Sequence, residues 1–192
     1  MRFFSLLAVA ATLLGTVSAA SLPVSQKPEC AHEEVVSTTY IGKDKNVKVE
    51  VSHCDDEQLV DAHGNLVTTL TKRQSTNVCG APCNTFCWSA TSGAPTSGDC
   101  TVIADALLYE SQNTGALFAV SPTGSSTNKV TMQYATCLTY FLNQDFNTLT
   151  YCRTEWSKLV TWLASDCSPA SSSNGGLCVA TDQRWYVQLQ HS

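Results

Sequence analysis

Apolar residues recur at helical spacing in two stretches of the chain, and the later stretch is the more regular. It places four apolar side chains at positions i, i+3, i+4 and i+7, which are Trp156, Leu159, Val160 and Leu163. Residues at this spacing share one face of an α-helix, so they predict a helix with one buried face. Glu155, Ser157, Lys158 and Thr161 then fall on or near the solvent side, and Cys167-Ser-Pro169 ends the helix.

The earlier stretch predicts a helix from about Gly98 to Gln112. Its regularly spaced apolar residues are Ile103, Ala106 and Leu107. Thr96 and Asp99 in front of them are typical of a capping box, in which side chains at both positions bind backbone N–H groups. Asn113-Thr114-Gly115 then stops the helix.

Alternation of apolar and polar residues predicts five short strands, over residues 116–120, 129–135, 137–143, 177–181 and 184–190. In the last strand Trp185, Val187 and Leu189 share one face, whereas Tyr186, Gln188 and Gln190 share the other. By contrast, Cys79 to Gly98 is rich in Cys, Pro, Gly, Ser and Thr and predicts a loop region. Two helices and a hairpin-rich order of strands predict an α+β fold, with an antiparallel sheet of about five strands.

The chain begins with the pattern of a secretory signal. Arg2 supplies the positive charge, residues 3–14 form an apolar run, and Val17-Ser18-Ala19 is a small-residue cleavage site. An apolar run of this length is too short to cross about 30 Å of hydrocarbon as a helix. We therefore expect a signal peptide over residues 1–19, secretion to the extracellular space and no membrane insertion.

The dibasic pair Lys72-Arg73 divides the rest of the chain. Residues 20–73 hold six Lys/Arg and nine Asp/Glu, and the alternating Val47, Val49 and Val51 predict a strand there. Processing proteases of the secretory pathway cut after such pairs, so we expect a pro-segment over residues 20–73 and a mature domain over residues 74–192. The residues leave open whether the pro-segment aids folding or masks a surface.

Cysteines occur in even numbers on both sides of the dibasic pair. The pro-segment holds Cys30 and Cys54, which are expected to bridge it internally, and the mature part holds eight, namely Cys79, Cys83, Cys87, Cys100, Cys137, Cys152, Cys167 and Cys178. In a secreted protein these predict disulfides rather than thiolates, each contributing about 2–4 kcal/mol. The sequence does not decide their pairing. A metal site in the closely spaced Cys79, Cys83 and Cys87 is the alternative, but secretion argues against it, so no metal and no other cofactor is expected.

Charge excludes two classes of partner. The mature part has four Lys/Arg against seven Asp/Glu, which leaves a net formal charge of −3. Nucleic-acid binding requires basic side chains that neutralise phosphates, and an anionic membrane surface requires them as well. We therefore expect neither partner.

The mature part also lacks the side chains of common hydrolytic sites. Its one histidine is His191, the penultimate residue, so a hydrolase with a Ser–His or Cys–His pair has no suitable base. A pair of carboxylates for glycoside cleavage remains possible, but the spacing of the acidic residues selects no pair. We therefore predict no catalytic residues, and a small secreted hydrolase is the third alternative.

Aromatic residues beside polar ones suggest a binding surface. Trp156 and Trp185 lie on apolar faces and are expected in the core. Trp88, in a polar loop, and Tyr186, on a polar strand face, are expected to form an exposed platform. An aromatic ring covers the apolar face of a sugar, while nearby polar groups bind its hydroxyls. The predicted glycan-binding residues are Trp88, Asp182, Arg184, Tyr186 and Gln188. Ordinary surface or inter-subunit contact is the alternative for each.

The mature part resembles the lectins of the inky-cap type, a small family of secreted mushroom glycan-binding proteins. The resemblance covers residues 74–192 and rests on CGAPCNTFC, DALLYESQNTG, TCLTYFLNQD, YCRTEW and GLCVATDQRWYVQ. It implies a single-domain α/β sandwich with a five-stranded antiparallel sheet, a homodimer joined through sheet edges, and non-catalytic binding of glycans or glycoproteins that contain N-acetylhexosamine. It has no counterpart for the pro-segment.

A secreted carbohydrate-binding protein with a role in recognition or defence is therefore the leading hypothesis. A secreted toxin, effector or inhibitor that acts on a protein partner is the alternative from another class.

Overall fold

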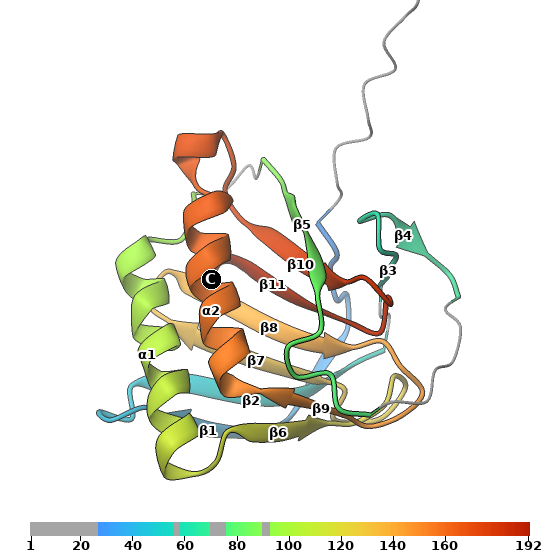
Figure 1. Ribbon diagram of the computed structural model, residues 1–192, viewed down its shortest axis with the longest axis horizontal. Helices are drawn as coiled ribbons and strands as arrows, with labels where there is room; N and C mark the ends of the chain where they lie inside the picture. The colour runs from blue at the N-terminus through green and yellow to red at the C-terminus, as the bar shows by residue number, and fades with distance from the viewer. Residues whose placement is uncertain (1–26, 56–57, 70–75, 90–92) are drawn as a thin grey trace, which may run out of the picture.

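A seven-stranded antiparallel sheet organises the chain, and two helices lie on one of its faces (Figure 1). The computed structural model describes residues 27–55, 58–69, 76–89 and 93–192. The predicted signal peptide, its cleavage site at Ala19 and the dibasic pair Lys72-Arg73 lie outside these residues. The α+β fold and the disulfide staples are confirmed.

The strands of the main sheet come from both sides of the dibasic pair. In spatial order they are β1 (Glu33–Ile41), β2 (Val47–Cys54), β7 (Lys129–Tyr134), β8 (Cys137–Asn143), β11 (Trp185–His191), β10 (Gly176–Ala180) and β5 (Cys83–Cys87). Two smaller pairs are β3 (Leu59–Val60) with β4 (Leu66–Val67), and β6 (Leu117–Val120) with β9 (Leu149–Cys152). The helices are α1 (Ser97–Asn113) and α2 (Arg153–Asp166), followed by a short 3₁₀ turn at Pro169–Ser171.

The five strands and two helices predicted for the mature part are confirmed, as is the strand around Val49. The loop prediction for residues 79–98 is wrong over Cys83–Cys87, which forms the edge strand β5 and pairs with β10. The sequence Cys-Asn-Thr-Phe-Cys does not alternate between apolar and polar residues, so it gives no strand signal. The sequence analysis also missed β9 and the long, solvent-exposed strand β1.

The helices bury one face against the sheet. Trp156, Val160 and Leu163 of α2 are inaccessible to solvent, as the helical spacing predicted. Ser157, which was expected near solvent, is buried because its hydroxyl donates to the carbonyl of Ala104 in α1, with 3.0 Å between the oxygens. This hydrogen bond joins the two helices directly.

Aromatic rings fill the space between the helices and the sheet. Phe141 of β8 stacks on Trp185 of β11, with 5.5 Å between ring centroids, and Tyr151 of β9 lies 4.9 Å from both rings. Burial raises the pKa of Tyr151, so this hydroxyl stays protonated. The core prediction for Trp156 and Trp185 is confirmed.

The capping box predicted at Thr96 and Asp99 does not form. The Thr96 side chain makes no cap hydrogen bond, and Asp99 instead accepts two bonds from Thr136 in the β7–β8 turn, at 3.0 Å from its N–H and 2.5 Å from its hydroxyl. These bonds, the one from the Thr136 side chain foremost, lower the pKa of Asp99. Asp99 thus links α1 to the sheet.

We expect Asp99→Asn to destabilise the protein near neutral pH and to have little effect in strong acid. The pKa of Asp99 is lower in the folded state, so its stabilising effect is complete above the unfolded value of about 3.9 and is lost as the pH falls through the folded value. Urea unfolding at about pH 7 and about pH 2.5 measures the difference. Asp105→Asn, at an exposed position of the same helix, is the control. An equal loss of stability at both pH values would contradict this account.

Five disulfides staple the fold, and each joins two cysteines on the same side of the dibasic pair. Cys30 pairs with Cys54 inside the predicted pro-segment, as expected. The mature part is closed by Cys79–Cys152, Cys83–Cys178, Cys87–Cys167 and Cys100–Cys137. No cysteine in the described residues is free. Within the same residues, no helix has both the length and the apolar character needed to cross a bilayer.

Candidate functional site

The sheet face turned away from α1 and α2, here called the helix-free face, collects aromatic and polar side chains of the mature part. Alternation along β11 sends Tyr186, Gln188 and Gln190 to this face while Trp185, Val187 and Leu189 join the core below the helices. Neighbouring strands add Lys129, Thr131, Tyr140, Leu142, Leu177, Val179 and Phe86, and Trp88 follows directly after β5.

Two tyrosines form the centre of the helix-free face. The ring of Tyr140 meets the ring of Tyr186 edge to face, with 5.8 Å between centroids, and the ammonium of Lys129 lies 4.4 Å from the Tyr140 centroid. Burial, followed by the nearby Tyr186, raises the pKa of Tyr140 well above its ordinary value. The Tyr140 hydroxyl is therefore a hydrogen-bond donor at any physiological pH.

The same face holds buried polar atoms without a hydrogen-bond partner. Among the described residues five such side-chain atoms occur, and three of them, Trp88 Nε1, Thr131 Oγ1 and Gln188 Oε1, belong to this face. A buried polar atom without a partner costs about 1–3 kcal/mol, so folds retain few of them. Three on one face suggest that these groups have a partner in another state of the protein.

Residues from before the dibasic pair cover the helix-free face. We call residues 27–55 and 58–69 the covering segment. Its first residues run behind the sheet in Figure 1, on the side away from the helices. The carbonyl of Pro28 accepts hydrogen bonds from Tyr140 Oη and from Gln188 Nε2, each at 3.4 Å. Val60 is fully buried in one apolar cluster with Trp88, Tyr140 and Tyr186.

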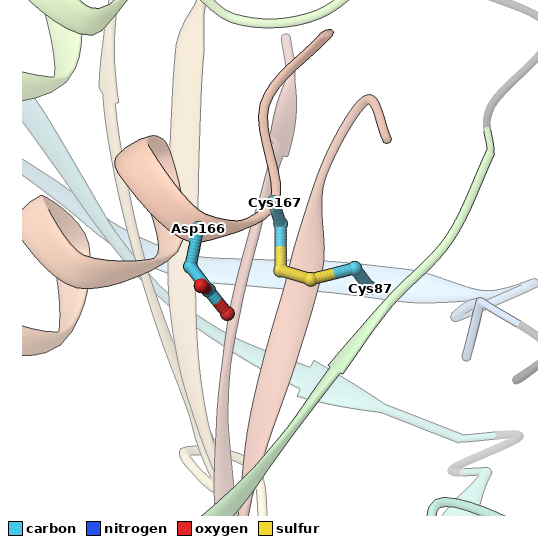
Figure 2. Close-up of side chains that lie close together, drawn as sticks. All are labelled: Cys87, Asp166 and Cys167. Carbon is cyan, nitrogen blue, oxygen red and sulfur yellow. A yellow bond between two sulfur atoms is a disulfide. The ribbon is translucent and has the colours of Figure 1, made fainter. Parts of the chain in front are cut away.

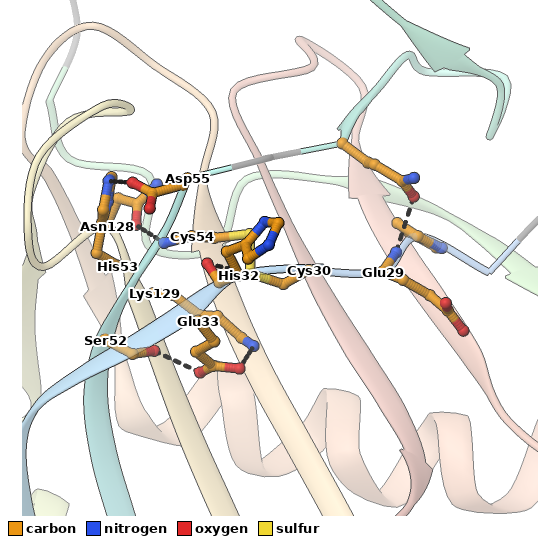
Figure 3. The surroundings of a disulfide bond; sticks show 12 residues. Glu29, Cys30, His32, Glu33, Ser52, His53, Cys54, Asp55, Asn128 and Lys129 are labelled. Atoms are coloured by element: carbon orange, nitrogen blue, oxygen red, sulfur yellow. Dashed lines mark hydrogen bonds and ion pairs between the residues drawn. A yellow bond between two sulfur atoms is a disulfide. The ribbon is translucent and has the colours of Figure 1, made fainter.

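An ion pair holds the start of β1 on this face (Figure 3). The Glu33 carboxylate lies 2.7 Å from Lys129 Nζ and accepts a second hydrogen bond from Ser52 Oγ at 2.6 Å. The Lys129 side chain is only 7% exposed, against 32% for Glu33. The disulfide Cys30–Cys54 lies next to this pair and ties the residues before β1 to the end of β2.

Two further contacts hold the β3–β4 hairpin against the mature part. The side-chain amide of Gln144 pairs with the backbone of Val60 as a neighbouring strand would, accepting from its N–H at 2.5 Å and donating to its carbonyl at 3.0 Å. Gly64, at a φ of +80°, lies so close to Phe86 that an added Cβ would be 2.8 Å from the ring. A larger residue at position 64 would push the hairpin away.

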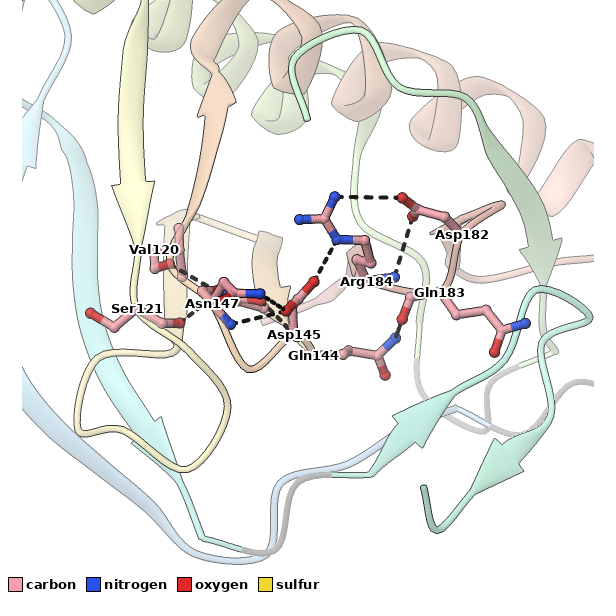
Figure 4. A network of polar contacts seen from close by, with 9 residues as sticks. Val120, Ser121, Gln144, Asp145, Asn147, Asp182, Gln183 and Arg184 are labelled. Atoms are coloured by element: carbon pink, nitrogen blue, oxygen red, sulfur yellow. Dashed lines mark hydrogen bonds and ion pairs between the residues drawn. The ribbon is translucent and has the colours of Figure 1, made fainter. Parts of the chain in front are cut away.

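A separate polar network closes the turns at one end of the sheet (Figure 4). Arg184 Nε donates to Asp145 Oδ2 at 2.5 Å, and both side chains are almost fully buried. Asp182 lies 3.7 Å from the same guanidinium, and Asp145 also accepts from the backbone and the side chain of Asn147. The guanidinium of Arg184 is thus bound within the protein.

The predicted glycan-binding residues therefore separate into two groups. Trp88, Tyr186 and Gln188 come together on the helix-free face, whereas Asp182 and Arg184 belong to the turn network. The expectation that Trp88 and Tyr186 are exposed is wrong, since they are 4% and 3% exposed beneath the covering segment. Sequence analysis missed Tyr140 and Lys129, because alternation along a strand does not say which side shares a sheet face with Tyr186, and the strand pairing decides this.

One cluster has the residue types of a metal site. The Cys87 and Cys167 sulfurs and an Asp166 oxygen lie within 4.8 Å of one another (Figure 2). The two sulfurs are bonded to each other, so neither is a thiolate that could bind a metal. This cluster is a disulfide with a carboxylate beside it.

Comparison of the chain with protein-family models and with curated proteins finds no match in either. The functional argument therefore depends on the geometry of the helix-free face.

Proposed function

We propose that this chain is a secreted, non-catalytic carbohydrate-binding protein that recognises glycans containing N-acetylhexosamine, with the helix-free face as its binding surface. The observation that carries the proposal is the meeting of Tyr140, Tyr186 and Trp88 with Lys129 and Gln188 on one side of a rigid sheet. Five disulfides suit a protein that acts in an oxidising, extracellular medium.

The chemistry of this face fits an N-acetylated sugar. Aromatic rings pack against the C–H groups of a pyranose, and the unpaired Gln188 Oε1 and Trp88 Nε1 offer one acceptor and one donor to its polar groups. An acetamido group has a carbonyl that accepts hydrogen bonds. Tyr140 Oη and Gln188 Nε2 both donate to the carbonyl of Pro28 in this structure. The same two donors could therefore bind an acetamido carbonyl.

The strands that residues 74–192 contribute to this face carry no carboxylate, which supports binding without turnover. Strands β7, β8, β11, β10 and β5 contribute no Asp or Glu to it. Glycoside cleavage requires an acid and a second carboxylate on opposite sides of the scissile bond. Asp145 and Asp182 lie in the turn network with Arg184.

Gln188→Leu is expected to weaken glycan binding about tenfold or more after removal of residues 20–73, because a leucine of similar size replaces both hydrogen-bonding atoms. Binding of the cut chain to arrayed glycans, followed by titration of the best ligand, measures this. Trp162→Phe is the control, since Trp162 is exposed on α2 and its Nε1 donates to Thr85. Failure of the cut chain to bind any glycan at millimolar concentration would refute the proposal.

A groove on the helices favours the second candidate, a protein that acts on a protein partner. Leu108 of α1 and Trp162 of α2 are 40% and 52% exposed and line one apolar depression. Aromatic anchors of this kind are frequent at protein interfaces. If Trp162→Ala no longer binds a protein from a host extract but still binds glycans, the result would favour this function.

A further inference from the structure

We infer that the covering segment is an intramolecular ligand that keeps the uncut chain latent, and that the Glu33 carboxylate takes the place of an acidic group on the glycan. The part concerning the glycan rests on the proposed function. The latency follows from four features of the contact between the covering segment and the mature part.

The first feature is the sheet edge. In the mature part alone, β7 is an outer strand with an unpaired row of backbone N–H and C=O groups. Here β2 pairs with it in antiparallel register from Lys48 opposite Gln133 to Ser52 opposite Lys129. Val47 and Val49 of β2 continue the core below the helices. Any strand that would pair with β7, from another molecule or from a second copy of this chain, finds the edge occupied.

The second feature is the helix-free face itself. Pro28 is buried there, and its carbonyl accepts from Tyr140 and Gln188, the groups proposed to bind an acetamido carbonyl. Val60 fills the space beside Trp88 and Tyr186. A glycan cannot reach these rings while the covering segment is in place.

The third feature is the charge at Lys129. Among the residues that the structure describes, this ammonium forms its ion pair with Glu33, which belongs to the covering segment. Departure of the segment removes that carboxylate and leaves a cation next to the Tyr140 ring. A carboxylate or sulfate on the glycan, close to the acetamido group, would restore the pair. The geometry therefore points to an acidic N-acetylhexosamine glycan rather than a neutral one.

The fourth feature is the distribution of the disulfides. The Cys30–Cys54 bridge lies within the covering segment, and the other four lie within residues 79–178. A cut after Arg73 therefore leaves the two parts joined by non-covalent contacts alone, and the segment is free to dissociate on dilution.

The covalent link between the covering segment and the mature part determines how strongly the segment inhibits glycan binding. A segment on a short linker acts at an effective concentration on the order of 1 mM. If the cut segment rebinds with a dissociation constant of about 1 µM, the uncut chain binds its glycan about 10³-fold more weakly than the cut chain.

The experiment compares the full secreted chain, made uncuttable by Lys72→Ala and Arg73→Ala, with the wild-type chain cut by a dibasic-specific protease. Size-exclusion chromatography at decreasing protein concentration reports release of the segment without any glycan. We expect release after the cut and a large gain in glycan binding. Equal binding by both forms would overturn the latency, whereas absence of binding in the cut form after a demonstrated release would refute only the proposed function.

Two variants test the contacts of the covering segment through a gain in glycan binding, which misfolding would not produce. In the uncuttable chain, Glu33→Gln and Gly64→Val loosen the segment, so each is expected to increase glycan binding about tenfold. Glu34→Gln, at the exposed neighbouring position of β1, is the matched control and should change nothing. Unchanged binding in both test variants would contradict the role of these contacts.

A pair of glycans with the same N-acetylhexosamine core, one neutral and one carrying a carboxylate or sulfate, tests the role of Lys129. The cut chain should bind the acidic glycan at least tenfold more tightly, and Lys129→Met should remove that preference, measured as the ratio of the two affinities in the same variant. Equal affinity for the two glycans would overturn the acidic-ligand part and leave the latency intact.

Discussion

Replacing both Cys83 and Cys178 by alanine is expected to lower the free energy of unfolding by about 3 kcal/mol. Their separation of 95 residues would by itself give about 4.7 kcal/mol in the chain-entropy account. The neighbouring bridge Cys87–Cys167 shortens the loop that Cys83–Cys178 closes. With that bridge in place, the path between the two cysteines covers only four residues from 83 to 87 and eleven from 167 to 178. A loop of about 15 residues corresponds to about 3 kcal/mol.

Loss of both bridges at once should be much more severe. Cys83 and Cys87 are the two ends of the edge strand β5, so together the bridges hold that strand to β10 and to the end of α2. The fourfold alanine variant should lose roughly 6 kcal/mol, which is close to the whole stability of many domains. Urea unfolding under non-reducing conditions measures each loss. The loss in the Cys83/Cys178 variant is compared with the additional loss when Cys87 and Cys167 are replaced as well. If the first loss is the larger, the bridge Cys87–Cys167 does not shorten the loop that Cys83–Cys178 closes.

Arg184→Met is expected to cost about 3–5 kcal/mol, since it leaves the buried Asp145 carboxylate without its cation. Both partners are almost inaccessible to solvent, so water cannot replace the lost ion pair. Thermal unfolding followed by circular dichroism measures this change.

The double variant Asp145→Asn, Arg184→Met is the critical control. An amide at position 145 keeps an acceptor for the Asn147 N–H and removes the uncompensated charge, so most of the lost stability should return. Additive losses in the double variant would show that the ion pair does not carry the coupling between the two turns.

The sheet is covered on both faces, but the two covers differ in how they are attached. The helices α1 and α2 are joined to the sheet by the disulfides Cys100–Cys137 and Cys87–Cys167. The cover of the helix-free face has no such bond to the mature part and leaves three polar atoms without partners beneath it. This difference suggests that only the second cover is built to be removed.

Alternation along β11 shows how much of the candidate site could be predicted. The pattern of Trp185 to Gln190 separates core residues from polar-face residues correctly, because the side-chain period of a strand is fixed by backbone geometry. The same rule applied to β8 groups Tyr140 with Leu138 and Leu142 but does not say which face of the sheet they occupy, and only the pairing with β11 and β7 places Tyr140 and Lys129 beside Tyr186. The exposure of Tyr186 and Trp88 was not predictable in this way, because burial depends on what covers a face.

The short edge strand β5 and the contacts of Asp99 were also beyond local patterns. Cys83–Cys87 becomes a strand because β10 lies beside it and two disulfides hold its ends. Asp99 binds Thr136, 37 residues away, instead of capping its own helix. In both cases a partner distant in sequence replaces the local one.

The sequence by itself determined the two amphipathic helices, the alternating strands and the even division of cysteines, since each of these follows from local periodicity or from simple counting. Only the tertiary structure decided that residues before the dibasic pair complete the sheet and cover its helix-free face. The physical reason is that strand pairing and burial join residues far apart in the chain, and such contacts leave no periodic signal in either partner.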